Sequence, residues 1–338
     1  MKIIIIGSGI AGVTFAEKAR ELMPEASITL LTRETYGYYS RPMLSPGFSK
    51  ENIEKTIVIK PFNKILEKNI CIISGVDVTG INREKQSIDV KGIDEIEELE
   101  YDKLVIATGS AAFIPPPFVA DRDNFYLFNS LKDLKQLRKF RQVLIKKQQK
   151  PHWAIIGGGL IGCELASDLA VSGDQVTLFH AMDRLMERQL VEEDSENLKA
   201  VMQSSGINVL FNQAVQGIPK MGTKVGVTVS DNQTEFDMVV VSCGFKPRTE
   251  LATKADLSIG RGIKVNQTLQ CSDENIVALG DVAEFPNGKL YAFISPIRNQ
   301  AQWLASFLSG QESEPWKPPA FDPKAKVHGF EAAHPYLF

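Results

Sequence analysis

The stretches KIIIIGSGIAG (residues 2–12) and HWAIIGGGLIG (residues 152–162) decide the fold of this chain. Each joins a short apolar run to a GxGxxG pattern and continues into a helical stretch and a second apolar run, ITLLT at 28–32 and QVTLFH at 175–180. Short, fully apolar runs are typical of parallel strands that are buried on both faces. The chain therefore repeats one strand–turn–helix–strand unit, which predicts an α/β fold with two Rossmann-like domains.

The glycine spacing in each unit predicts a dinucleotide site. The first glycine permits a tight turn after the strand, the second lets the backbone approach a pyrophosphate, and the third lets the helix pack close to the strand. The pyrophosphate then lies at a helix N-terminus, where free N–H groups and the helix dipole favour negative charge. Two units predict two cofactors, with hydride or electrons passing between them. The residues expected at the two pyrophosphates are Gly7, Gly9, Ile10, Ala11 and Gly12, and Gly157, Gly159, Leu160, Ile161 and Gly162.

Length, charge and hydropathy narrow the class of protein. A chain of 338 residues suits two or three domains. Its net charge of −3 argues against a nucleic-acid-binding protein or a membrane-surface protein. No apolar run approaches the length of a membrane span. The N-terminus enters a strand at once without a cleavable signal, so we expect a cytoplasmic protein.

The cysteines and histidines predict neither a disulfide nor a metal site. Cys71, Cys163, Cys243 and Cys271 are scattered without a CxxC pair, which is typical of a reducing compartment, and we expect all four to be buried free thiols. The four histidines lack metal-ligand spacing, so no bound metal is expected.

Four motifs, in this order, carry a resemblance to a known family. They are Gly7–Gly12, YDKLVIATG at Tyr101–Gly109, Gly157–Gly162 and ALGD at Ala278–Asp281. From residue 1 to about 310 the chain resembles the two-dinucleotide-binding flavoproteins, whose best-known members are the pyridine nucleotide–disulfide oxidoreductases. The resemblance implies FAD at the first fingerprint and NAD(P)H at the second.

The resemblance also implies that the second domain is inserted in the first. The FAD-binding domain would comprise 1–112 and 245–312, and the NAD(P)H-binding domain would comprise 113–244. The stiff run at 115–117, three prolines, lies near the first boundary. Relatives usually continue into a sheet-containing interface domain, so 313–338 is expected to be a short or truncated remnant of it. The acidic stretch at 93–100 is expected to form a solvated hairpin arm.

Further cofactor contacts follow from the resemblance. The carboxylate of Asp281 would accept hydrogen bonds from the ribityl chain of FAD, and the backbone of Val78 would meet the adenine. Glu164 matches an acidic residue near the nicotinamide. The other residues implied at FAD are Thr32, Arg33, Glu34, Thr108, Gly109 and Gly280, and Gly244 is implied at NAD(P)H.

Both ribose positions depart from the usual pattern, in which an acidic residue ends the second strand. In the first unit the position falls at Thr32, with Glu34 two residues on, and we expect the turn at 32–34 to hold the ribose. In the second unit it falls at His180, with Asp183 and Arg184 after it. His180 and Arg184 would tolerate a 2′-phosphate, so NADH is expected and NADPH stays open.

The segment at 36–50 distinguishes branches of the family. Disulfide reductases carry a CxxxxC pair there, and NADH oxidases and coenzyme A-disulfide reductases carry a single nucleophilic cysteine. This chain has no cysteine before Cys71, so electron relay through sulfur is not expected. The run YSRPMLS at 39–45 instead resembles the electron-transfer branch, the rubredoxin and ferredoxin reductases. The longer run YSRPMLSPGFSK, with IGCELASDL, is most similar to rubredoxin reductases of the alkane-oxidising type, and implies that Arg41 holds the FAD pyrophosphate or the flavin edge.

The implied activity is transfer of electrons from NADH through FAD to rubredoxin or a similar small iron–sulfur carrier. Flavin suits this task because it exchanges electrons both in pairs and singly. No side chain need act as acid, base or nucleophile, so no catalytic residue is expected. Two alternatives remain, an NADH oxidase that makes hydrogen peroxide and a non-catalytic flavoprotein resembling apoptosis-inducing factor.

Docking of the carrier is less defined by the sequence. Residues 131–150 contain eight basic side chains and one Asp. They predict either a solvated helix face or a patch that steers an acidic carrier. Lys324 and Lys326 lie near the place where rubredoxin reductases carry a lysine beside the flavin. A reduced interface domain predicts a monomer or a weak dimer.

Overall fold

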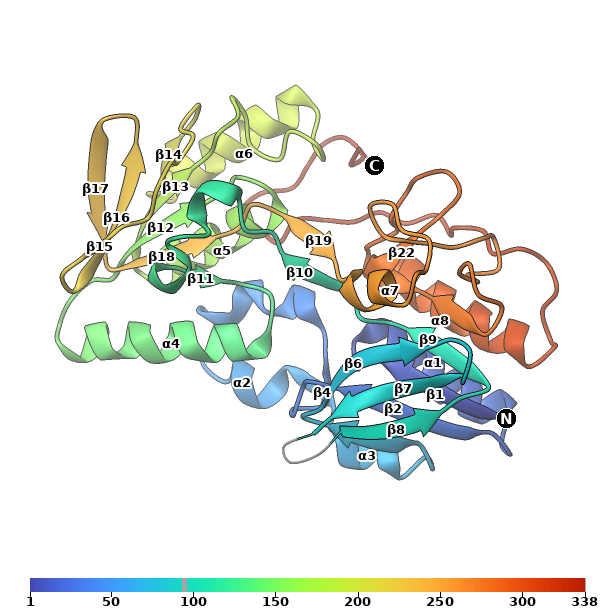
Figure 1. Ribbon diagram of the computed structural model, residues 1–338. Coiled ribbons are helices and arrows are strands. Elements are labelled where there is room, and N and C mark those ends of the chain that lie inside the picture. The colour runs from blue at the N-terminus through green and yellow to red at the C-terminus, as the bar shows by residue number, and fades with distance from the viewer. Residues whose placement is uncertain (93–95, 338) are drawn as a thin grey trace. The chain divides into compact units, whose positions relative to one another are not determined.

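The computed structural model describes residues 1–92 and 96–337, and these group into two compact units (Figure 1). Each unit is built around a five-stranded parallel sheet. The segments of unit 1 are Met1–Ser40, Val58–Ala111 and Lys246–Phe321, and those of unit 2 are Arg41–Ile57, Ala112–Phe245 and Asp322–Phe338.

The chain leaves unit 1 at Ala111 and returns to it at Lys246. The boundaries fall close to the expected 112 and 245. Two segments group differently from the expectation. Residues 41–57 belong with unit 2, and the expected remnant 313–338 is divided at Phe321. Hydrogen bonds to carboxylates of unit 2, described below, explain both differences.

The parallel sheet of unit 1 has the strand order β21-β9-β1-β2-β5. Its central strand β1 (Lys2–Ile6) is followed by helix α1 (Ile10–Leu22). Every position from Ile3 to Ile6 is buried, as a strand covered on both faces requires. The other strands are β2 (Ser27–Thr32), β5 (Cys71–Ser74), β9 (Lys103–Ile106) and β21 (Ile276–Ala278).

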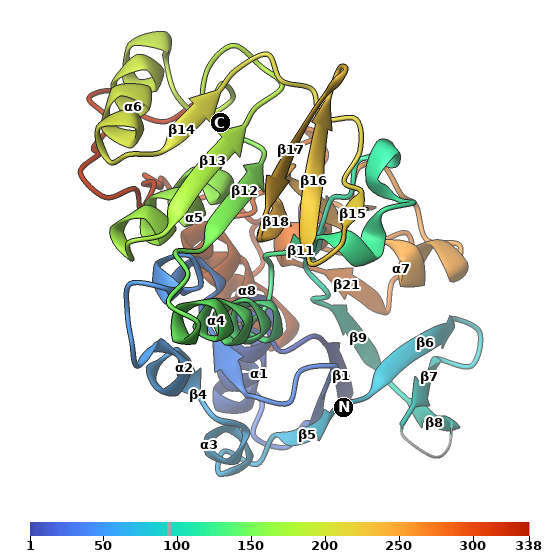
Figure 2. The same ribbon diagram turned by 90° about the vertical axis from the view of Figure 1, so that its left-hand side faces the viewer.

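Two layers cover the sheet of unit 1. Helices α1 and α8 (Ile294–Leu308) pack against each other on one face, and the antiparallel sheet β6-β7-β8 lies over the other (Figures 1 and 2). The strands of that sheet are β6 (Asp77–Asn82), β7 (Ser87–Lys91) and β8 (Ile96–Glu100). Strand β8 contains the described part of the acidic hairpin arm predicted at 93–100, whereas 93–95 lie outside the described residues. The small elements of unit 1 are β3 (Tyr38–Tyr39), β4 (Val58–Lys60), α3 (Phe62–Leu66), α7 (Glu250–Lys254), β20 (Ile263–Lys264) and β22 (Ala283–Glu284).

The sheet of unit 2 has the equivalent order β11-β18-β12-β13-β14. Helix α5 (Leu160–Val171) follows β12 (His152–Ile156), just as α1 follows β1. In Figure 2, α5 and α6 (Glu192–Ser204) lie on one side of this sheet and the antiparallel strands β15–β17 lie on the other. The remaining strands are β11 (Tyr126–Leu127), β13 (Gln175–Phe179), β14 (Asn208–Leu210), β15 (Lys220–Met221), β16 (Lys224–Val229), β17 (Asn232–Phe236) and β18 (Met238–Val241).

Strands β10 (Ser110–Ala112) and β19 (Phe245–Pro247), which pair in a two-stranded sheet, carry the chain out of unit 1 and back. Segment 41–57 contains the short turns η1 (Arg41–Met43) and η2 (Ser45–Gly47) and the helix α2 (Ile53–Thr56).

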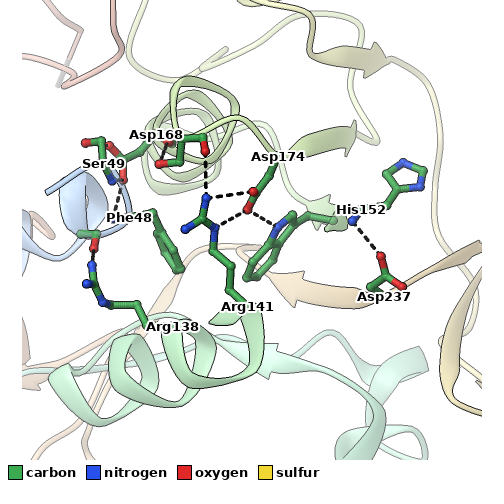
Figure 3. Close-up of polar contacts among 11 residues, drawn as sticks. Phe48, Ser49, Arg138, Arg141, His152, Asp168, Asp174 and Asp237 are labelled. Atoms are coloured by element: carbon green, nitrogen blue, oxygen red, sulfur yellow. Dashed lines mark hydrogen bonds and ion pairs between the residues drawn. The ribbon is translucent and has the colours of Figure 1, made fainter. Parts of the chain in front are cut away.

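Helix α4 (Leu131–Lys146) begins at a capping box, in which the side chains of Ser130 and Asp133 each accept a backbone N–H. Two of its basic side chains are tied into unit 2 (Figure 3). Arg138 donates to the carbonyl oxygens of Lys50 at 3.2 Å and Glu51 at 2.8 Å. Figure 3 also shows Arg141 reaching Asp174. The basic helix is therefore partly a structural element, and a steering role for its basic side chains stays a prediction.

Asp174 joins a helix to a strand in the interior of unit 2. Its carboxylate accepts from Arg141 Nε at 2.7 Å, from Arg141 Nη2 at 3.0 Å and from the indole N–H of Trp153 at 2.8 Å. The side chain of Asp174 is 2% exposed and that of Arg141 is 17% exposed. An ion pair this buried is costly to break from one side, because the remaining charge loses its partner.

We expect Asp174→Asn to lower the free energy of unfolding by about 3 kcal/mol, because it removes the charge that compensates buried Arg141. Urea unfolding followed by far-ultraviolet circular dichroism measures this loss. Asp231→Asn, the same change on an exposed turn, is the matched control and should leave unfolding unchanged. Equal stabilities for the two variants would contradict the assignment.

Candidate functional site

The predicted residues of the first fingerprint lie along the carboxyl edge of the unit 1 sheet. The strand register aligns Ile6 with Leu31 and with Ile106, and aligns Ile106 with Ala278. Because the strands are parallel, the residues that follow them meet at one edge. The loops that begin there contain Gly7–Gly12, Thr32–Glu34, Thr108 and Gly109, and Gly280 and Asp281.

The glycines of the first fingerprint are required by close backbone approach. Gly7 has a φ of +115°, and a Cβ there would lie 2.3 Å from the carbonyl oxygen of Ala107. A Cβ on Gly12 would lie 1.9 Å from the carbonyl oxygen of Gly7. Any side chain at either position would collide with backbone, so both glycines hold α1 close to β1.

The second fingerprint repeats this geometry. Gly157 has a φ of +114°, and its Cβ would lie 2.4 Å from the carbonyl oxygen of Ser242. A Cβ on Gly162 would lie 1.9 Å from the carbonyl oxygen of Gly157. The two units therefore match in the backbone as well as in the sequence.

The middle glycine has a different role in each fingerprint. A Cβ on Gly9 or on Gly159 would have no non-neighbouring heavy atom within 4 Å. Each of these glycines caps its helix in extended backbone, without a side-chain cap and without an acidic residue in the first turn. The space beside each middle glycine is thus open, and it adjoins a helix N-terminus without a side-chain cap, which fits a phosphate.

At the end of β2 the expected ribose turn is held by side chains. The hydroxyls of Ser8 and Thr32 lie 2.8 Å apart and are buried. Glu34 accepts a hydrogen bond from the Tyr39 hydroxyl at 2.8 Å. Arg33 pairs instead with Asp77 at 2.6 Å in an exposed ion pair. Glu34 thus has a fixed carboxylate at this edge, whereas Arg33 points to a neighbouring strand.

Asp281 lies beside the N-terminus of α1. It follows Gly280, whose φ of +80° and whose N–H bond to the side-chain oxygen of buried Gln300 at 2.8 Å define the turn. A Cβ on Gly280 would lie 3.2 Å from the Cβ of Ala11. The half-buried carboxylate of Asp281 accepts from the Ser110 hydroxyl at 2.7 Å. Residues far apart in sequence therefore meet at the first fingerprint.

Thr108 and Gly109 form the connection out of β9. The Thr108 hydroxyl donates to the carbonyl oxygen of Arg248 at 3.2 Å, and the Arg248 N–H donates to the carbonyl oxygen of Gly109 at 3.0 Å. Gly109 has a φ of +66°. Val78 is buried in β6, close to the ribose turn, because Val76 donates its N–H to the carbonyl oxygen of Thr32.

At the second fingerprint, His180 follows β13 directly beside the glycines. Only 7% of the residue is exposed, and its Nδ1 accepts the N–H of Gly158 at 3.0 Å. Its Nε2 lies 3.3 Å from Glu187 Oε2. Arg184 donates to the carbonyl oxygens of Glu187 and Leu190, each at 2.8 Å. Both side chains are thus bonded within the protein, and whether they tolerate a 2′-phosphate stays a prediction.

Glu164 lies one turn into α5 and is 2% exposed. One carboxylate oxygen accepts from the Ser45 hydroxyl at 2.5 Å, and the other accepts from the backbone N–H of Lys326 at 2.8 Å. The structure therefore gives Glu164 the role of holding two segments of unit 2 to α5, and its contact with nicotinamide stays a prediction. Gly244, with a φ of +104°, lies after β18.

Asp168, one turn further along α5, also binds segment 41–57. It accepts the N–H groups of Phe48 at 2.7 Å and Ser49 at 3.1 Å, and lies 3.3 Å from His328 Nε2 (Figure 3 shows the first two residues). Lys326 donates its side chain to the carbonyl oxygen of Pro42 at 3.0 Å. Carboxylates on one helix thus hold 41–57 and 322–337 in unit 2.

Arg41 and Lys324 are placed outside these contacts. Arg41 begins η1 in unit 2, directly after the last residue of the first unit 1 segment. Lys324 pairs with Glu331 at 3.2 Å, and both side chains are exposed. Their predicted proximity to a flavin stays a prediction.

The cysteines are free thiols. Burial raises the pKa of Cys243 to about 11, and burial together with the charge of Asp273 raises that of Cys271 to about 12. Burial and the neighbouring carboxylates also raise the pKa of Cys163, which is fully buried. The expectation that all four are buried is right for Cys163 and wrong for the others, because Cys71 on the edge strand β5 is exposed and Cys243 and Cys271 are only partly buried. These three raised pKa values disfavour a reactive thiolate.

Sequence reasoning missed the supporting side chains. Tyr39, Ser110 and Glu187 each contact a predicted residue from a distant or irregular part of the chain. Ser8 was detectable, since it occupies the second position of the fingerprint. The others depend on turns whose path the sequence does not define.

A family model described as pyridine nucleotide-disulphide oxidoreductase matches residues 1–303, and the chain belongs to this family of oxidoreductases. Within the described residues, no helix has the length and apolar character needed to cross a membrane. Those residues also hold no group of three or more His, Cys, Asp or Glu side chains arranged for a metal ion.

Two relatives and one solved structure are similar to most of this chain. The chain is 35% identical over 315 residues to a protein of Aliivibrio fischeri named nitric oxide reductase FlRd-NAD(+) reductase, covering 93% of this chain and 80% of the relative. It is 34% identical to the rubredoxin-NAD(+) reductase of Alcanivorax borkumensis, covering 92% and 80%. The structure matches the covalent putidaredoxin reductase–putidaredoxin complex with a TM-score of 0.86 and 26% identity, covering 97% and 79%.

The third and the middle glycine of the first fingerprint should respond differently to substitution by alanine. Gly12→Ala should prevent stable folding of unit 1, because its Cβ would meet a backbone oxygen. Gly9→Ala should leave the thermal midpoint of cofactor-free protein within a few degrees of the parent, because that Cβ meets open space. Thermal unfolding by circular dichroism compares them. A stable Gly12→Ala protein would contradict the close packing described here.

Proposed function

We propose that the protein is an FAD-dependent NADH oxidoreductase that passes electrons to rubredoxin or a similar small iron–sulfur carrier. Unit 1 would bind FAD and unit 2 would bind NADH. The relatives named after NAD(+), rubredoxin and flavorubredoxin reduction support this assignment. The paired fingerprints support the use of two dinucleotides.

The residues of unit 1 fit FAD. The uncapped helix N-terminus and the open space at Gly9 suit a pyrophosphate. Glu34, oriented by Tyr39, supplies for the ribose hydroxyls a carboxylate, which Thr32 lacks. Asp281, oriented by Ser110, supplies a carboxylate for the ribityl hydroxyls. The complete proposed set is Gly7, Gly9, Ile10, Ala11, Gly12, Thr32, Arg33, Glu34, Arg41, Val78, Thr108, Gly109, Gly280 and Asp281.

The residues of unit 2 fit a nicotinamide dinucleotide in the same way. The open N-terminus of α5 would take its pyrophosphate. The proposed set is Gly157, Gly159, Leu160, Ile161, Gly162, Glu164, His180 and Gly244.

The choice of acceptor rests on the absence of cysteine from the segment at 39–45. Bound flavin would supply the exchange between paired and single electrons. This segment carries no thiol for a relay, and the thiols with raised pKa values, Cys163, Cys243 and Cys271, lie elsewhere in the chain. The chain's own work is then to bind and orient two cofactors and to keep water from them. Free cysteines agree with a cytoplasmic location.

Rapid mixing tests the proposal. Protein loaded with FAD and reduced by NADH should be reoxidised by rubredoxin about tenfold or more faster than by air-saturated buffer, because the proposed acceptor would take single electrons directly from the flavin. Rapid reoxidation by oxygen alone, with peroxide formed, would establish an NADH oxidase instead. A persistent charge-transfer band without turnover on either acceptor would identify a binding flavoprotein. Both results would overturn the proposal.

Flavin content tests the FAD site separately. Gly9→Val should fold yet retain less than about a tenth of the parent's flavin, because its side chain fills the space proposed for the pyrophosphate. The ratio of flavin to protein absorbance after desalting measures this. Glu21→Gln, an exposed change on the same helix, is the control and should retain full flavin. If Gly9→Val retained the full flavin content, FAD would not bind at this fingerprint.

A further inference from the structure

The second unit lacks an acidic residue at the end of β13, yet a carboxylate reaches that place from another part of the chain. His180 occupies the position itself. Its ring lies against the fingerprint so closely that a Cβ on Gly158 would be 2.7 Å from the His180 Cγ. The ring also points its other nitrogen at Glu187, with Nε2 and Oε2 3.3 Å apart.

The hydrogen bonds assign the proton of this imidazole. Because the N–H of Gly158 donates to Nδ1 at 3.0 Å, Nδ1 is an acceptor and carries no proton. A neutral ring then carries its proton on Nε2 and donates it toward Glu187. The histidine therefore bridges the fingerprint and the carboxylate without placing a positive charge between them.

The loop that carries Glu187 is bonded to the same fingerprint. The N–H of Met186 donates to the carbonyl oxygen of Gly158 at 2.9 Å, and Met186 is fully buried with a φ of +49°. Arg184 holds the carbonyl oxygen of Glu187 from the other side at 2.8 Å. Both polar groups of the Gly158 backbone are thus used to fix the approach of residues 180 and 187.

Glu187 keeps one carboxylate oxygen for a ligand. Its Oε2 faces His180, whereas its Oε1 lies 3.6 Å from the Nε of Arg188. Arg188 is 85% exposed, so water weakens this ion pair. The side chain of Glu187 itself is 22% exposed.

We propose that Glu187 recognises the adenosine ribose diol of the nicotinamide dinucleotide and selects NADH over NADPH. This inference rests on the proposed function of unit 2. A carboxylate accepts hydrogen bonds from both ribose hydroxyls, and it repels a 2′-phosphate. The guanidinium of Arg184 is held by the carbonyl oxygens of its own loop, which fixes the direction of its N–H groups. His180 is a positioning residue that acts through Glu187.

Equilibrium titration of the full-length FAD-loaded protein with NAD⁺ and NADP⁺, read by isothermal calorimetry, tests this without turnover. We expect the parent to bind NAD⁺ more tightly. Glu187→Gln should lower the ratio of the two affinities on the order of tenfold, mainly by improving NADP⁺ binding. The matched control is Glu193→Gln, an acidic side chain of α6 that is 81% exposed, and it should leave the ratio unchanged.

A double variant tests the role of His180. If the histidine acts through Glu187, His180→Asn and Glu187→Gln should not add in their effect on the affinity ratio. Additive effects would show that His180 contacts the nucleotide directly and would overturn the positioning role. An unchanged ratio in Glu187→Gln would overturn the inference while NAD⁺ binding persists. Loss of all nucleotide binding in the parent would instead refute the proposed function.

Discussion

The packing of a helix onto the turn before it constrains both units. In each, the third fingerprint glycine comes so close to the carbonyl oxygen of the first that no side chain fits between them. This contact directs the N-terminus of α1 and of α5 at the edge where the parallel strands of each unit end in register. The location of each candidate site thus follows from backbone packing, and the side chains only refine it.

Side-chain carboxylates position the segments whose place is not determined by the backbone packing. Glu164 and Asp168 face inward from α5, where burial makes unpaired carboxylates costly, and they bind segments 41–57 and 322–337. The segment in which related enzymes carry cysteine is held here by hydrogen bonds to a helix of unit 2. The cysteine-free segment 41–57 is therefore grouped with unit 2 by hydrogen bonds to α5.

The sequence was sufficient for the parts that depend on backbone geometry. Strand patterns and glycine spacing predicted the repeated unit and the edges where Gly7 and His180 lie, whereas the insertion and the place of Asp281 were implied by the family resemblance. It was insufficient where a side chain bonds across the chain. The pairing of Glu187 with His180 depends on a left-handed residue at Met186, which leaves no pattern in composition. The exposure of Cys71 depends on strand order, which local hydropathy does not contain.

The contact between the second fingerprint residue and the end of the second strand has a consequence for comparing and redesigning such domains. In unit 1 this contact joins two small hydroxyl side chains, those of Ser8 and Thr32. In unit 2 it joins the backbone N–H of Gly158 to the imidazole ring of His180. A serine in place of Gly158 would collide with His180. These two positions should therefore covary among homologous domains. If only the strand-end residue were exchanged to change the cofactor preference, the result would be either a steric clash or a backbone N–H without an acceptor.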